Sequence, residues 1–388
     1  MNNISILTYH HIANNGAALF AYSMQQALRE LFPANTVRIL DYRDVGMQAY
    51  EWLKTLKPFR QIPAFNLQRR RTFSQFQDKE FQYDAGLGRT TRAQKLARRL
   101  ASPDQAAWIT GMDVWNIGSV RWLPGFPNPY WLPWEGRAKK IAYAVSGYRS
   151  DDDAVEQEND RLGELLRGFD LIGVRDRYTR DLVITALDGE SASVAEVPDP
   201  TFLYEVRESS AREAMASQGI DLDRPVLGLL LFGKDDLSGR LRDHYHAKGY
   251  QLAALSMFNP WADVNLGHVL DPHQWAESFR HFSFCVTDRF HGAIFCLKNG
   301  IPFIAIEPDA LPSIKHSKLN DLLDEFGLQD CYFDPHDSEF NIEELLGRAG
   351  ELERYWQEIY LPKVVNKLAD METRSREFLG RVNQVVSG

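Results

Sequence analysis

The sequence predicts an α/β protein with two Rossmann-like domains that face a cleft. Apolar runs of strand length alternate with helical segments along most of the chain, which is the pattern of parallel βαβ units. At 388 residues the chain is longer than most single domains, which indicates two domains with separate hydrophobic cores. We expect domains at 1–205 and 225–350, a charged linker at 206–224, and a helical segment at 351–388 that packs back across both.

The first domain is expected to begin with two strands around a helix, at residues 4–8, 17–31 and 37–41. Asn14, Asn15 and Gly16 lie in the loop before this helix, whose free backbone N–H groups can hold a polar ligand. A single glycine lacks the G-x-G-x-x-G spacing of a dinucleotide-binding turn. A tight turn with a helix cap is the alternative that the spacing favours.

The middle of the first domain carries arginines and aromatic residues. Residues 44–102 predict helices and a long mobile loop that forms a lid or a wall. The strand at 104–110 ends in a turn with Asp113 and Asn116. The run at 122–134 is rich in Trp and Pro, and two interpretations of Trp131 stay open: a flat surface against a sugar ring, or a ring packed on the core.

Two more strands, at 139–146 and 169–174, complete the first sheet, and Arg175 directly follows the second of them. The carboxyl ends of parallel strands lie at one edge of a sheet, which is where open α/β sheets bind ligands. We therefore expect Asp113, Asn116 and Arg175 to lie close together.

The second domain contains the clearest βαβ unit of the chain, at 282–307; other elements are expected at 225–232, 237–248, 251–257, 271–279, 319–326 and 342–386. Arg289 and His291 lie in its turn, at a helix N-terminus. A cation, an imidazole and free amides together indicate a site for a phosphate or a carboxylate. Pairing of Arg289 with Asp288, a capping role for His291 and close packing at Gly292 are the alternatives.

Composition and charge limit the class of protein. A net charge of −9 argues against a nucleic-acid binder. The chain starts with a strand rather than a secretory signal, and no apolar run reaches the ~18 residues of a membrane span, so we expect a cytoplasmic protein. Cys285, Cys296 and Cys331 are expected to be buried thiols, and no His, Cys or carboxylate spacing predicts a metal site.

Seven stretches, taken in order, resemble the polysaccharide pyruvyl transferase family and span roughly residues 14 to 307. They are Asn15 to Tyr22, Ile39 to Arg43, Thr110 to Asn116, Lys140 to Ser146, Gly173 to Asp176, Asp199 to Thr201 and Thr287 to Gly292.

This resemblance implies a glycosyltransferase-B-like fold, with the acceptor on the first domain and the donor on the second. It implies an enzyme that uses phosphoenolpyruvate to place a pyruvate ketal across two hydroxyls of a sugar, without a cofactor. The resemblance assigns phosphoenolpyruvate to Arg175, Arg289, His291 and Gly292, and we expect Lys318 as a further contact to it.

Acceptor contacts are expected from the first domain, at Asn14, Asn15, Gly16, Asp113, Asn116 and Trp131. Two arginines and a helix N-terminus suit a ligand that carries both a carboxylate and a phosphate. His291 is the candidate acid and Asp113 the candidate base.

Two alternatives remain from the sequence. A nucleotide-sugar glycosyltransferase of the same fold would use a carboxylate such as Glu307 on the ribose, and a catalytically silent sugar-binding member would lack donor groups. A lipid-linked acceptor would bring the protein to the inner membrane surface as a peripheral protein.

Overall fold

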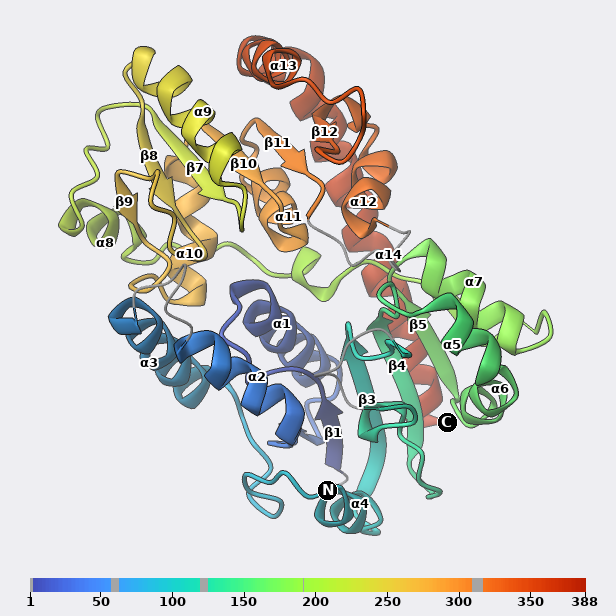
Figure 1. Cartoon of the computed structure of the whole chain (residues 1–388). Helices are drawn as coiled ribbons and strands as arrows, with labels where there is room; N and C mark the ends of the chain where they lie inside the picture. The colour runs from blue at the N-terminus through green and yellow to red at the C-terminus, as the bar shows by residue number, and fades with distance from the viewer. Residues whose placement is uncertain (1–2, 57–62, 119–124, 191, 309–316) are drawn as a thin grey trace.

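The chain forms two parallel six-stranded sheets, each covered by helices (Figure 1). The computed structural model describes residues 3–56, 63–118, 125–190, 192–308 and 317–388. In the first sheet the strands are β1 (Asn3–Leu7), β2 (Thr36–Ile39), β3 (Gln105–Met112), β4 (Lys139–Val145), β5 (Leu171–Val174) and β6 (Val194–Glu196). Its helices are α1 (Asn15–Leu31), α2 (Val45–Leu56), α3 (Pro63–Glu80), α4 (Ala93–Leu100), α5 (Asp152–Gln157), α6 (Asn159–Arg167) and α7 (Arg177–Ala186).

The second sheet takes its strands from residues after the predicted linker. They are β7 (Val226–Leu230), β8 (Gln251–Ala254), β9 (Val264–Asn265), β10 (Phe284–Thr287), β11 (Phe303–Ile306) and β12 (Tyr332–Phe333). The remaining helices are α8 (Ala211–Ser217), α9 (Asp235–Ala247), α10 (Pro272–Ser278), α11 (Phe290–Asn299), α12 (Lys318–Phe326), α13 (Ile342–Tyr355) and α14 (Leu361–Ser387), with a short turn η2 (Pro200–Phe202) after the first sheet.

Strand order places a ligand-binding edge in each domain. The first sheet has the order β2-β1-β3-β4-β5-β6 and the second β12-β11-β10-β7-β8-β9. All neighbouring strands are parallel, and the side of the sheet to which the chain adds its next strand changes between β1 and β3 in the first sheet and between β7 and β10 in the second. These are the topological switch points at which doubly wound sheets leave a crevice beyond the strand ends.

The C-terminal helix α14 packs across both domains, as the sequence predicts, and Figure 1 shows it running from the second domain alongside the first sheet. Phe378 is buried; its ring centroid lies 5.2 Å from that of Tyr143, and it covers the site where a Cβ on Gly173 would lie. Arg374 pairs with Glu325 of α12. The two-domain α/β fold with a returning C-terminal helix is therefore confirmed.

The helices predicted within residues 44–102 are confirmed in the described part as α2, α3 and α4. Buried residues of α3, among them Phe65, Thr72 and Phe76, recur every three or four positions and give the helix one buried face of mixed apolar and polar side chains. That face meets the second domain, where Thr72 donates to the His268 carbonyl at 2.9 Å and Phe65 packs on the His268 ring. The loop at 81–92 joins α3 to α4, and because Phe81, Leu87 and Thr90 are buried it packs on the domain and does not form the predicted lid; residues 57–62 lie outside the described ranges.

Candidate functional site at the domain interface

The strand ends of the first domain bring together one buried arginine and two carboxylates. Arg175 follows β5, Asp113 follows β3 and Asp199 follows β6. The guanidinium of Arg175 donates to Asp199 Oδ2 at 2.5 Å and also pairs with Asp113. The Arg175 and Asp199 side chains are 2% and 0% exposed. The structure thus places Asp113 and Arg175 at one sheet edge, where the strand order leads us to expect them.

Lys318 joins this cluster from the second domain. Its Nζ donates to Asp113 Oδ2 at 2.7 Å, so Asp113 bridges a cation from each domain. The ring of Phe290 lies beside both cations, 4.8 Å from the guanidinium carbon of Arg175 and 5.2 Å from the Lys318 nitrogen. An aromatic face favours a cation at such distances.

The two carboxylates are held ionised. Burial opposes the charge of Asp113, but Lys318 and Arg175 outweigh it and hold the pKa of this carboxyl well below its usual range. Burial also opposes the charge of Asp199, and His291 and Arg175 keep its pKa well below the usual range. A carboxylate with so low a pKa is a weak base. The electrostatics therefore argue against the predicted role of Asp113 as the base for an acceptor hydroxyl.

His291 lies in the first turn of α11 and meets the first domain. Its Nε2 is 3.4 Å from Asp199 Oδ2, and its side chain is 15% exposed. A Cβ built on Gly16 would lie 2.1 Å from His291 Nδ1, so the start of α1 fits against the imidazole only because residue 16 is a glycine. The imidazole of His291 therefore packs directly against Gly16.

Arg289 is the N-cap residue of α11 and pairs with Asp288, whose Oδ1 lies 2.8 Å from Arg289 Nε. The guanidinium also lies 5.4 Å from the centroid of Phe232, and its side chain is 36% exposed. The cap makes no side-chain hydrogen bond to the helix. Gly292 packs on Thr287, where a Cβ would lie 2.2 Å from Oγ1. Two of the three alternatives considered for this turn, pairing with Asp288 and close packing at Gly292, are observed.

Trp131 is a core residue, which corrects the expected sugar contact. It is 0% exposed, and its ring stacks on Trp115 with centroids 4.5 Å apart. No face of the ring is open to a sugar. Trp122, in the same Trp-rich run, lies outside the described residues.

Asn14, Asn15 and Asn116 are predicted acceptor contacts, and they differ in the hydrogen bonds that their side chains already make within the protein. Asn14 caps α1, since its Oδ1 accepts from the Ala17 N–H at 3.1 Å. Asn116 holds its own turn, donating to the Asp113 carbonyl at 2.9 Å and accepting from the Arg149 N–H at 3.0 Å. Asn15 is buried and its Oδ1 has no hydrogen-bond partner among the described residues. Of these three, Asn15 alone has a side-chain oxygen that accepts no hydrogen bond among the described residues.

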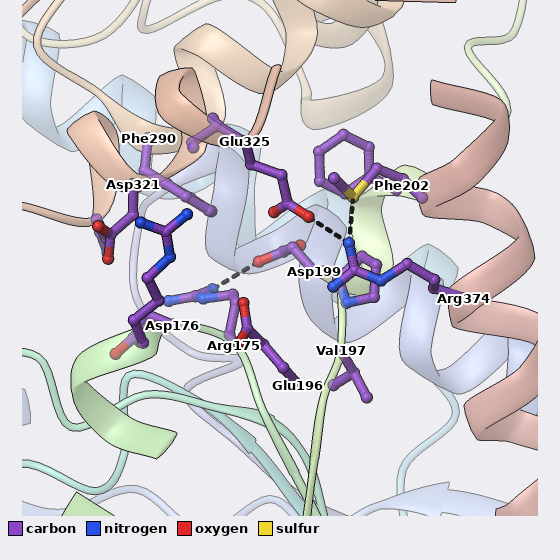
Figure 2. A pocket seen from close by; sticks show the side chains of 15 residues that line it. Arg175, Asp176, Glu196, Val197, Asp199, Phe202, Phe290, Asp321, Glu325 and Arg374 are labelled. Atoms are coloured by element: carbon purple, nitrogen blue, oxygen red, sulfur yellow. Dashed lines mark hydrogen bonds and ion pairs between the residues drawn. The ribbon is translucent and has the colours of Figure 1, made fainter. Parts of the chain in front are cut away.

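A pocket opens beside the cluster, where the two domains meet the C-terminal helix. Figure 2 shows Arg175 and Asp199 on one side, Asp321 and Glu325 of α12 on another, and Arg374 of α14 opposite. Lys318 and Phe290 also line it. Among the described residues, no group of three or more His, Cys, Asp or Glu side chains is arranged to hold a metal ion.

The sequence matches the polysaccharide pyruvyl transferase family over residues 14–310. The chain belongs to this family. The match covers most of the chain and every predicted site residue except Lys318, and it confirms the resemblance carried by the seven stretches. This family membership makes the protein a transferase that acts in pyruvyl transfer to polysaccharide. No curated protein matches the sequence.

Solved structures share the fold of this pyruvyl transferase family member at low identity. A UDP-GlcNAc 2-epimerase from Neisseria meningitidis, bound to UDP-GlcNAc, is 10% identical with a TM-score of 0.59, covering 99% of this chain and 100% of that one. A Siraitia grosvenorii ugt transferase in complex with UDP is 12% identical with a TM-score of 0.55, covering all of both chains. These likenesses confirm the glycosyltransferase-B-like architecture.

Two groups at the centre of the site were not among the predicted site residues. Asp199 is the buried carboxylate between Arg175 and His291, and Phe290 is the ring beside both cations. Asp199 lies in the Asp199-Pro200-Thr201 stretch, one of the seven that carry the family resemblance, so that signal was available, whereas the strand β6 before it was not predicted. Phe290 stands between Arg289 and His291, and nothing in its own pattern distinguishes it from a core phenylalanine.

Proposed function

We propose that this protein transfers pyruvate from phosphoenolpyruvate to a sugar of a bacterial-type polysaccharide, or of its lipid-linked precursor, and forms a pyruvate ketal. One observation carries the proposal: cations from both domains converge on a single carboxylate. Arg175 and Lys318 together hold Asp113, so their arrangement suits a ligand carboxylate. Phosphoenolpyruvate carries such a group, together with a phosphate.

The reaction forms two C–O bonds and breaks one. The methylene carbon of phosphoenolpyruvate gains a proton and becomes a methyl group, while one sugar hydroxyl adds to the neighbouring carbon. The second hydroxyl then adds to the same carbon as the C–O bond to phosphate breaks. One hydroxyl proton balances the new methyl hydrogen, and the other leaves with inorganic phosphate.

We assign the proton transfers to His291, because imidazole is the side chain that enzymes use most often as a general acid and base. Its Nε2 is oriented toward Asp199 at 3.4 Å, and Gly16 fixes the other side of the ring. Asp113 becomes a positioning residue in this scheme, because it holds Arg175 and Lys318 in place. Asn15 and the pocket beside Arg175 are where we propose that the acceptor binds.

Thermal unfolding tests the donor. We expect phosphoenolpyruvate at a hundred times its Kd to stabilise the wild type by ~2.7 kcal/mol, a shift of a few degrees. Arg289→Met should remove the shift, and Arg240→Met is the matched control, since Arg240 is an exposed arginine of α9 that pairs with Glu343. Phosphate release that depends on added acceptor then reports turnover.

The competing function is nucleotide-sugar-dependent glycosyl transfer. Glu307, its candidate ribose ligand, already accepts hydrogen bonds from Ser317 and Tyr332 at Oε2, and burial raises the pKa of its carboxyl. Stabilisation by a nucleotide sugar and not by phosphoenolpyruvate would overturn pyruvyl transfer.

An acceptor on a lipid carrier would place the protein at the cytoplasmic face of the inner membrane. No helix among the described residues is long and apolar enough to span a membrane. Co-sedimentation with anionic vesicles, with and without a lipid-linked sugar, measures this part of the proposal.

A further inference from the structure

Arg69 on helix α3 is a buried cation that lies outside the cluster described above. The residue is 9% exposed, and its Nε has no hydrogen-bond partner among the described residues. Its Nη1 donates to the thioether sulfur of Met257 at 3.0 Å, and its guanidinium carbon lies 5.4 Å from the ring centroid of Phe73. A thioether is a weak acceptor and carries no charge.

This environment does not compensate the charge of Arg69. Within the described ranges, no carboxylate lies within ion-pairing distance of the guanidinium, and buried charges in proteins are normally paired. Burial lowers the pKa of Arg69 to about 10, with Glu51 acting against this effect and Arg289 adding to it. An arginine stays protonated at neutral pH even so.

Arg69 lies at the ligand-binding edge of the second sheet. Met257, its contact, follows β8; Phe232 follows β7; and Arg289 follows β10. In the sheet these strands are neighbours in the order β10-β7-β8, with the topological switch point between β10 and β7. Helix α3 therefore brings a cation of the first domain to the edge where Arg289 and the uncapped start of α11 lie.

We propose that Arg69 and Arg289 form a two-domain site for a phosphate-type anion, with Arg69 as a ligand-binding residue. The anion would accept hydrogen bonds from the free Nε–H of Arg69, from the guanidinium of Arg289 and from the first backbone N–H groups of α11. The phosphate group can come from the donor or from the diphosphate of a lipid-linked acceptor. The proposal rests on the two arginines and stands if pyruvyl transfer fails.

Calorimetry on the full-length protein tests the site, with phosphoenolpyruvate and a short-chain prenyl diphosphate sugar as separate probes. We expect Arg69→Met to weaken at least one of them by ~10- to 100-fold, since a hydrogen bond to a charged group contributes about 1.5–3 kcal/mol. Arg71→Met is the control, because Arg71 lies two residues further along α3 with an exposed side chain; its affinity should stay within about twofold.

The unliganded variant supplies an independent measurement. If Arg69 serves a ligand, Arg69→Met keeps or raises the melting temperature, because it removes an uncompensated buried charge. Arg69→Lys retains the charge without the planar fork and should bind with intermediate affinity.

Loss for phosphoenolpyruvate alone identifies the donor phosphate as the ligand, and loss for the diphosphate alone identifies the acceptor. If the wild-type protein binds only the diphosphate, the proposal of pyruvyl transfer is ruled out, while the proposal of the Arg69–Arg289 site stands. A lower melting temperature with both affinities unchanged in Arg69→Met and Arg69→Lys would overturn the proposal and make Arg69 a packing residue.

Discussion

Replacing Gly16 with alanine perturbs the interface between the domains at one known contact, the side chain of His291. The added Cβ would lie 2.1 Å from His291 Nδ1 and 2.6 Å from His291 Cβ. Ordinary carbon contacts are about 3.5–4.0 Å, so the imidazole or the start of α11 must move by more than about 1 Å.

Displacement of a reacting group by about 1 Å costs about 100-fold in rate, and this is the loss of turnover that we expect for Gly16→Ala. The stability of the fold should change little. Alanine is favoured over glycine within a helix by about 0.5–1 kcal/mol, which offsets part of the strain. Phosphate release from phosphoenolpyruvate in the presence of acceptor measures the first effect, and thermal unfolding measures the second.

Two controls separate the contact from a general effect of the substitution. Gly347 lies in α13 with nothing within 4 Å of an added Cβ, so Gly347→Ala should leave turnover unchanged. A double-mutant cycle with His291→Gly, read out as the affinity for phosphoenolpyruvate, should show that Gly16→Ala has no further effect once the ring and Cβ of residue 291 are gone. Turnover within threefold of wild type in Gly16→Ala, or an equal loss in both backgrounds, would refute this reasoning.

Four further substitutions test other parts of the description. Asp113→Asn should destabilise the fold by ~3 kcal/mol, because two cations lose their carboxylate, while the pH–rate profile keeps its acidic limb; loss of that limb would restore the role of base. Trp131→Ala should cost about 3–5 kcal/mol in unfolding free energy without raising KM for the acceptor, and a raised KM in a stable variant would contradict its core position. Phe378→Ala should cost a similar amount in chemical denaturation, whereas the exposed Val365→Ala should stay within ~0.5 kcal/mol. Burial lowers the pKa of Lys298 to about 8 against ~10.4 when unfolded, so its charge costs stability below pH 8 and the cost fades as the pH rises. The stability advantage of Lys298→Met should therefore shrink by about 1 kcal/mol per pH unit between pH 8 and 10, and a difference that is constant with pH would contradict the shift.

Strand ends were predictable from the sequence because each apolar run stops at a polar turn. Arg175, Asp113 and Arg289 each follow such a run, and parallel pairing then places them at the ligand-binding edges. The convergence of Asp113 and Arg175 needed no knowledge of tertiary contacts, since both belong to one sheet.

Contacts between the domains were not predictable in the same way. Gly16 fits His291 across 275 positions of the chain, and Arg69 reaches Met257 from a helix that the sequence presented as part of a lid. Helix α3 is rich in arginine, and part of its buried face, at Phe65 and Thr72, lies against His268 of the second domain. Trp131 failed as a sugar contact for a related reason: the aromatic pattern is the same whether a ring faces solvent or stacks on Trp115.

The balance of charge explains why the site needs a second pair of cations, Arg69 and Arg289, in addition to Arg175 and Lys318. Around Asp113 and Asp199, the charges of Arg175 and Lys318 are cancelled, since two cations face two carboxylates. A phosphate group adds about 1.5–2 negative charges at neutral pH, which this cluster cannot compensate.

Arg289 pairs with Asp288, whereas Arg69 has no ion-pair partner among the described residues and Glu51 acts on its charge only at longer range. Under the proposed function, the donor carboxylate would then replace Asp113 on Arg175 and Lys318, and its phosphate would lie toward Arg69. A carboxylate analogue without phosphate should consequently keep most of its affinity in Arg69→Met, whereas inorganic phosphate should lose it.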